Sequence, residues 1–172
     1  MLLFAMALVI LGGCGSGSSG SSTNSDPLGA STEFMQKGGN DQPATFGRIA
    51  NVDEREAASH VLEKNLAARA AGNWAAQCAT LTAGKIAQVE EQGKSFGGGH
   101  GCAANLRALA EPVSQTKKFR ADTLKGPIEV FRVKGQLGYA LYHGTGNKDY
   151  AMLMKKEGGE WKVARLATTP IP

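Results

Sequence analysis

The chain has 172 residues, a formal net charge of +4 and an apolar fraction of 42%. Residues 105–172 carry 12 Lys and Arg against 6 Asp and Glu, which favours attraction to an anionic membrane or wall polymer. The alternative is a solvated sheet face rich in lysine. Because these positive charges are scattered rather than clustered, we expect no nucleic-acid partner.

The chain begins with an uncharged apolar run, Met1 to Leu11, which two glycines and Cys14 follow. The run is too short to span a bilayer, which takes about 20 apolar residues, but its length is that of the apolar core of a secretory signal. No Lys or Arg precedes it, although secretory signals normally start with positive charge. A true start codon upstream would explain this departure.

The stretch Leu11-Gly12-Gly13-Cys14 resembles the bacterial lipoprotein signal, in which an apolar residue and two small residues precede an invariant cysteine. The resemblance implies that the thiol of Cys14 receives a diacylglyceryl group and that residues 1–13 are removed as a signal peptide. We therefore expect lipid anchoring to the extracytoplasmic face of the cell membrane, because two or three acyl chains anchor stably. The alternative is an ordinary signal peptide with a coincidental cysteine.

The segment after Cys14 has the composition of a flexible spacer. Residues 15–23 are Gly, Ser and Thr only, and the residues up to 48 are largely polar with isolated apolar side chains. We expect a lipidated cysteine and a disordered tether over residues 14–48, followed by a single folded domain over residues 49–172.

Two cysteines, Cys78 and Cys102, remain once Cys14 is assigned to the lipid. In an oxidising compartment an even pair predicts a disulfide. Such a bridge would close a loop of about 25 residues and stabilise the fold by roughly 3 kcal/mol in the loop-entropy model. Two buried free thiols, or half of a metal site, are the alternatives.

Helices are predicted between residues 51 and 111. Asp53, with Glu56 three residues later, predicts the N-terminal cap of the first helix, and Gly72 suits its C-terminal cap. A short second helix carries Trp74 and Cys78 one turn apart, and Thr82 is the predicted cap of a third helix that ends near residue 92. A fourth helix is predicted over residues 102–111.

A glycine-rich loop, residues 93–101, separates the third helix from the fourth. It lacks the ending of a phosphate-binding loop and no strand precedes it, so we expect no bound nucleotide or other cofactor. His100 lies close to Cys102, but a metal site needs more ligands than this pair supplies. We therefore expect no metal.

Beyond residue 115 the pattern becomes that of strands. Turn signals separate four runs rich in β-branched and aromatic residues, and their spacing of about eleven residues predicts an antiparallel meander. Helices followed by such a sheet predict an α+β fold. The runs are residues 128–133, 137–142, 150–155 and 161–166, with residues 119–124 as an earlier, shorter candidate.

Several short stretches, taken in order, resemble small actinobacterial lipoproteins of the nuclear-transport-factor-2-like superfamily. The resemblance implies a cone in which N-terminal helices pack on a curved antiparallel sheet, often around a pocket. Some relatives are isomerases, dehydratases or polyketide cyclases, whereas many only bind or assemble, so the fold does not decide function. The stretches are Ala71-Gly72-Asn73-Trp74, Cys78, Leu81-Thr82, Cys102 and residues 157–163.

Enzymes of this superfamily usually place an Asp or His inside the cone as the general base. His60 is better explained as a surface or packing residue of the first helix, and His143 as a solvated residue at a strand end. Asp122 and Asp149 fall at strand beginnings or turns, and no two titratable residues share a strand face at two-residue spacing. We therefore expect no catalytic residue.

The expected function is non-catalytic binding of a small apolar ligand, an envelope component or a protein partner. An aromatic and Met-rich pocket would suit an apolar ligand, although the same residues could simply be core. The rivals are an isomerase- or dehydratase-type enzyme and a module that forms a homodimer through its open sheet face. The candidate pocket residues are Trp74, Phe131, Tyr139, Tyr150, Met152 and Trp161.

Overall fold

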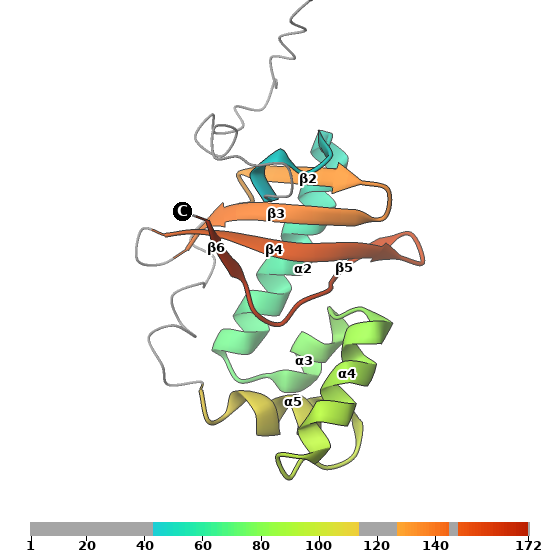
Figure 1. The fold of residues 1–172 in the computed structure, drawn as a ribbon, viewed down its shortest axis with the longest axis vertical. Coiled ribbons are helices and arrows are strands. Elements are labelled where there is room, and N and C mark those ends of the chain that lie inside the picture. Colours follow the sequence, from blue (N-terminus) through green and yellow to red (C-terminus); the bar gives the residue numbers. More distant parts are fainter. Residues whose placement is uncertain (1–42, 114–126, 145–147, 172) are drawn as a thin grey trace, which may run out of the picture.

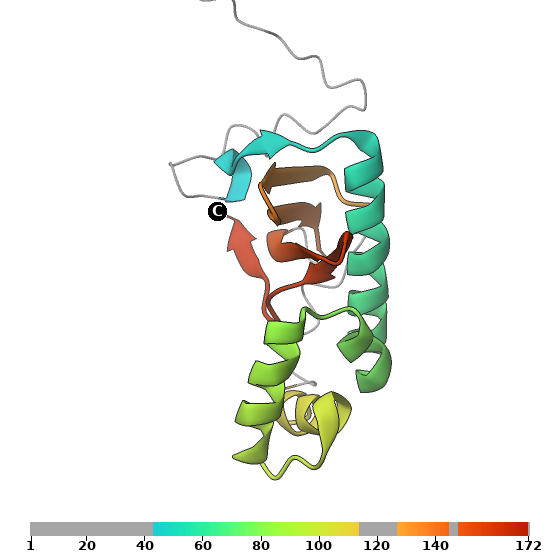
Figure 2. The same ribbon diagram turned by 90° about the vertical axis from the view of Figure 1, so that its right-hand side faces the viewer.

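The computed structural model describes residues 43–113, 127–144 and 148–171. They form an α+β fold in which the long helix Val52–Ala70 packs along one face of an antiparallel sheet of six strands, and the other three helices lie together beyond one edge of that sheet (Figures 1 and 2). This confirms the predicted fold class. The sheet is not closed on itself, which is compatible with the cone-like fold that the resemblance implies.

The helices begin and end close to the predicted residues. Asn51, not Asp53, caps the first of them: its side chain accepts a hydrogen bond from the Glu54 backbone N–H (2.9 Å), and the Glu54 carboxylate accepts one from the Asn51 N–H (3.1 Å). Thr82 caps α4 as predicted. The helical elements are the 3-10 turn η1 (Pro43–Thr45), α2 (Val52–Ala70), α3 (Trp74–Ala79), α4 (Ala83–Lys94) and α5 (Gly101–Ala110).

The sheet is an antiparallel meander in the order β1-β2-β3-β4-β5. Strand β6 pairs with the beginning of β4, and β5 pairs with the end of β4. The four predicted strand runs are confirmed, but the last ends at Val163, and β1 and β6 were not predicted. The candidate strand at residues 119–124 lies outside the described residues. The strands are β1 (Arg48–Ile49), β2 (Val130–Lys134), β3 (Leu137–His143), β4 (Asp149–Glu157), β5 (Glu160–Val163) and β6 (Thr169–Ile171).

The main core lies between the helices and one face of the sheet. Figure 1 shows α2 running behind the strands, and Figure 2 shows it along one side of them. The register places Ala140 opposite Met152 on this face, and both side chains are fully buried. The rings of Phe131 and Trp161 meet edge to face with centroids 4.8 Å apart, which tightens the contact between β2 and β5.

The other face of the sheet is covered in part by residues 43–47, which we call the N-terminal strap. Ala44 is buried against this face, and the Phe46 ring packs edge to face on Tyr139 with centroids 5.1 Å apart. Arg132 holds the strap by donating hydrogen bonds to the carbonyl oxygens of Phe46 (2.8 Å) and Gly47 (2.9 Å). Residues 43–48, which lie before the expected domain boundary, therefore pack on the described sheet.

The glycine-rich loop wraps around Asn105 of α5. The Asn105 side-chain amide donates hydrogen bonds to the carbonyl oxygens of Gly99 (2.8 Å) and Gly101 (2.9 Å), and the residue is buried. A Cβ atom on Gly93 would lie 2.3 Å from the Asn105 Cβ, and one on Gly98 would lie 2.2 Å from its Oδ1. These glycines therefore let α4 and α5 approach each other, which gives the loop a structural role.

This contact predicts opposite effects for two alanine substitutions in the same helix. Gly93→Ala should lower the free energy of unfolding by about 1–3 kcal/mol, because the added methyl group would overlap Asn105. Gly84→Ala should leave stability unchanged or raise it by up to about 1 kcal/mol, because its Cβ would meet open space and alanine favours helix. Urea unfolding followed by circular dichroism measures both, and equal effects would contradict the packing described.

Candidate functional site

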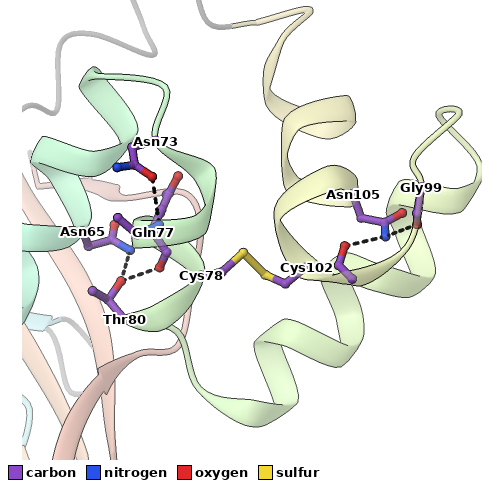
Figure 3. The surroundings of a disulfide bond; sticks show 10 residues. Asn65, Asn73, Gln77, Cys78, Thr80, Gly99, Cys102 and Asn105 are labelled. Carbon is purple, nitrogen blue, oxygen red and sulfur yellow. Dashed lines mark hydrogen bonds between the residues drawn. A yellow bond between two sulfur atoms is a disulfide. The ribbon is translucent and has the colours of Figure 1, made fainter.

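The disulfide joins α3 to α5 through Cys78 and Cys102, whose Cα atoms lie 6.1 Å apart (Figure 3). The predicted pairing is confirmed. Beside it, the Asn65 amide of α2 donates to the Thr80 hydroxyl (2.7 Å), and that hydroxyl donates to the carbonyl oxygen of Gln77 (2.6 Å). The bridge and this buried chain of hydrogen bonds fix α3 between α2 and α5.

The candidate pocket residues do not line one common cavity. Phe131, Tyr150 and Met152 are buried in the main core. This agrees with the alternative hypothesis that they are core residues and do not line a pocket. Trp74 lies at the margin of that core and is partly buried. Tyr139 lies on the opposite face of the sheet beneath the N-terminal strap. Of the six, Trp161 alone borders the groove described next.

An open groove of about 990 Å³ runs along α2, and we call it the α2 groove. Its walls are the outer flank of α2, the start and end of α3, and the β4–β5 hairpin. Most of its surface is apolar, because the side chains toward its floor are small or aromatic. These are Ala57, Val61, Ala67, Ala68 and Ala71 of α2 with the adjoining C-cap, Ala76 and Ala79 of α3, and Trp161 of β5.

The groove exists because α2 uses only one of its faces for the core. Leu62 and Leu66 are buried against the sheet, whereas Ala57 and Ala67 remain exposed on another flank. After α2, Gly72 adopts a positive φ of 66°, which suits glycine and turns the chain. The Asn73 side chain then caps α3 by accepting a hydrogen bond from the Ala76 N–H (3.1 Å). This turn places α3 beside α2 at one end of the groove.

Charged side chains stand around the apolar floor. Two of the acidic ones are paired: Glu54 with Arg48 (2.8 Å), and Glu160 with Lys162 (3.0 Å). The Lys156 ammonium lies 5.9 Å from the centroid of the Trp161 ring, close enough for a cation–π interaction. His60, which we expected to be a surface or packing residue, is exposed at the groove.

A second cluster, which sequence reasoning missed, lies across the β3–β4 hairpin. His143 Nδ1 is 2.5 Å from Asp149 Oδ1, because the register places these two residues opposite each other. The His143 side chain is 39% exposed and that of Asp149 is 10% exposed. Neither residue lines the α2 groove, so the pair ties the hairpin and does not contribute to that site.

Within the described ranges, no group of three or more His, Cys, Asp and Glu side chains is arranged to hold a metal ion. The helices of the same ranges include none that is both long and apolar enough to cross a membrane.

Comparisons with protein-family models, with curated proteins and with solved structures found no match to this chain.

The groove residues on α2 were also missed, although their spacing places them on one flank of the helix. Ala57, Val61 and Lys64 recur at helical spacing beside the buried face, so they lie along one flank of the helix. Their small size is equally typical of an exposed helix surface. Only the position of α3 and of the β4–β5 hairpin turns this flank into a groove.

The carboxylate of Glu54, at the rim of the groove, predicts a pH-dependent contribution to stability. Hydrogen bonds from the Arg48 guanidinium and from the Asn51 backbone N–H hold the pKa of Glu54 below its ordinary value. A lowered pKa stabilises the fold above the ordinary value, and this contribution is lost as the pH falls through the lowered one. Glu54→Gln should therefore reduce the free energy of unfolding by about 0.5–1 kcal/mol at neutral pH.

The difference between Glu54→Gln and the unmodified chain should shrink in acid, and urea unfolding across a pH series measures it. Glu56→Gln, on the same helix turn, is the control and should change stability little at any pH. A Glu54→Gln effect of constant size from neutral pH into strong acid would contradict the ionic origin of this contribution.

Proposed function

We propose that this protein is a membrane-anchored extracytoplasmic lipoprotein whose domain binds an apolar ligand in the α2 groove without catalysing a reaction on it. The observation that carries the proposal is the apolar floor of this groove, which extends from the first turn of α2 to α3. A path along α2 from Asp53 to Ala71 spans roughly 27 Å at the usual rise of a helix. That length suits an elongated molecule more than a compact one.

The packing around the groove supports binding outside the main core. Phe131, Met152 and Tyr150 fill the space between the sheet and the helices, so a ligand in the predicted interior position would have to displace them. Displacing large core side chains costs several kcal/mol each, roughly 2–5 for residues of this size. The groove offers apolar surface without that cost.

The two rival functions have less support. A general base of the isomerase or dehydratase type would have to reach the ligand, and the His143–Asp149 pair does not line the groove. A homodimer through the sheet face would have to pack where the N-terminal strap already covers Val130 and Leu141. On the described strands, Leu137 is the one large apolar residue that remains exposed, with 41% of its surface accessible to solvent.

Membrane anchoring is proposed from Cys14 and from its distance along the chain to the fold. Residues 15–42 separate this cysteine from Pro43, where the N-terminal strap begins. A chain of this length and polar composition would let the domain stand away from the membrane surface.

Replacing the lipidated residue tests the anchoring. Cys14→Ser should move the protein from the membrane fraction to the soluble fraction of fractionated cells, because the diacylglyceryl group needs the thiol. Ser16→Ala, two residues later, is the control and should remain in the membrane fraction. Continued membrane retention of Cys14→Ser would refute the anchor.

Native mass spectrometry of the full chain carrying Cys14→Ser tests the groove. We expect a small apolar molecule to co-purify, and we expect Ala67→Glu to lose it, because a carboxylate would stand over the apolar floor. Ala70→Glu alters another exposed alanine of α2 that does not line the groove, and it should retain the ligand. Loss of the ligand from both variants, or from neither, would contradict the proposed site.

A further inference from the structure

The α2 groove is lined by two lysines whose ammonium groups form no ion pair with a carboxylate of the described residues, although the charge of Lys156 contributes to the lowered pKa of Glu54. Lys64 of α2 and Lys156 of β4 both line the groove, and neither takes part in an ion pair within those ranges. Three other lysines are each paired with a neighbouring acid: Lys94 with Glu91, Lys155 with Glu157 and Lys162 with Glu160. Neither ammonium group is therefore held by a carboxylate, although that of Lys156 also lies over the Trp161 ring.

The other charged side chains of the groove determine which charge on a ligand head group would neutralise the site. Glu54 and Glu160 are engaged by Arg48 and Lys162, so their charges are already balanced. Asp53 contributes one further carboxylate, in the first turn of α2, where the helix dipole favours negative charge. Two free ammonium groups against this single carboxylate leave one uncompensated positive charge.

The geometry points to a single-chain amphiphile with a carboxylate head group, of the fatty-acid class, as the occupant of the α2 groove. The alkyl chain would lie on the apolar floor toward Ala71 and Ala79, and the carboxylate would lie between Lys64 and Lys156. One negative charge neutralises the groove, whereas a dianionic phosphate would leave it negative. This inference rests on the proposed function and adds the chemical class of the ligand.

Three ligands that share a dodecyl chain separate the contribution of the head group from that of the chain. They are dodecanoate and dodecyltrimethylammonium, each titrated below its micelle concentration, and dodecanol, titrated below its solubility limit, into the full chain carrying Cys14→Ser. The chain has two tryptophans, so Trp74→Phe leaves Trp161, which borders the groove, as the one indole reporter of binding. Isothermal titration calorimetry on the chain with both tryptophans repeats the series without that substitution.

Dodecanoate should bind roughly tenfold more tightly than dodecanol, and the ammonium ligand should bind most weakly, because charge-assisted hydrogen bonds to two lysines favour the anion. Lys64→Ala and Lys156→Ala should each reduce this preference without abolishing the binding of dodecanol. Lys134→Ala, on β2 and outside the groove, is the control and should keep the preference.

The outcomes distinguish this inference from the proposed function. Equal binding of all three ligands would overturn the carboxylate class and leave an apolar groove in place. A preference for the anion that survives both lysine substitutions would overturn the position of the head group. Binding of none of the three would overturn the proposed function together with the inference.

Discussion

Two backbone hydrogen bonds join the connection between α3 and α4 to the edge of the sheet. The Val163 N–H donates to the carbonyl oxygen of Thr80 (2.8 Å), and the Thr82 N–H donates to the carbonyl oxygen of Val163 (3.1 Å), so the chain between α3 and α4 pairs with β5 as a parallel bridge around Leu81. This pairing covers the free edge of a short strand, which would otherwise leave backbone groups open to another chain. The positions of α3 and α4 depend on this pairing together with the disulfide, which holds α5 against α3.

The same bridge determines where the α2 groove opens. The bridge holds the end of α3 at β5. The outer flank of α2 is therefore lined both by α3 and by the β4–β5 hairpin, which contributes Trp161. The Glu157 carboxylate reinforces this arrangement by accepting a hydrogen bond from the Ala83 N–H at the start of α4 (2.9 Å), which lowers its pKa. The site is thus a consequence of how the helical and sheet parts are joined.

Local signals in the sequence predicted the local structure well. The Thr82 cap, the strand runs and the cysteine pair depend on neighbouring residues or on simple elimination, and the structure confirms them. Strand β1 has only two residues, which is too short for a sequence pattern. The β2 backbone pairs with it and Arg132 binds the strap, and both partners lie far along the chain. The Asp53 cap was wrong because Asn51 and Glu54 form an equivalent pair two residues earlier.

The groove could not be predicted because its residues carry no distinctive local signal. Exposed alanines on α2 and α3 are what helix propensity alone would select, so they do not identify a binding site. Unpaired surface lysines are equally ordinary. What distinguishes Lys64 and Lys156 is that α2 and the β4–β5 hairpin, about ninety residues apart along the chain, bring both to the rim of one apolar floor. A ligand with a charged head and an apolar chain would satisfy both parts of that surface at once.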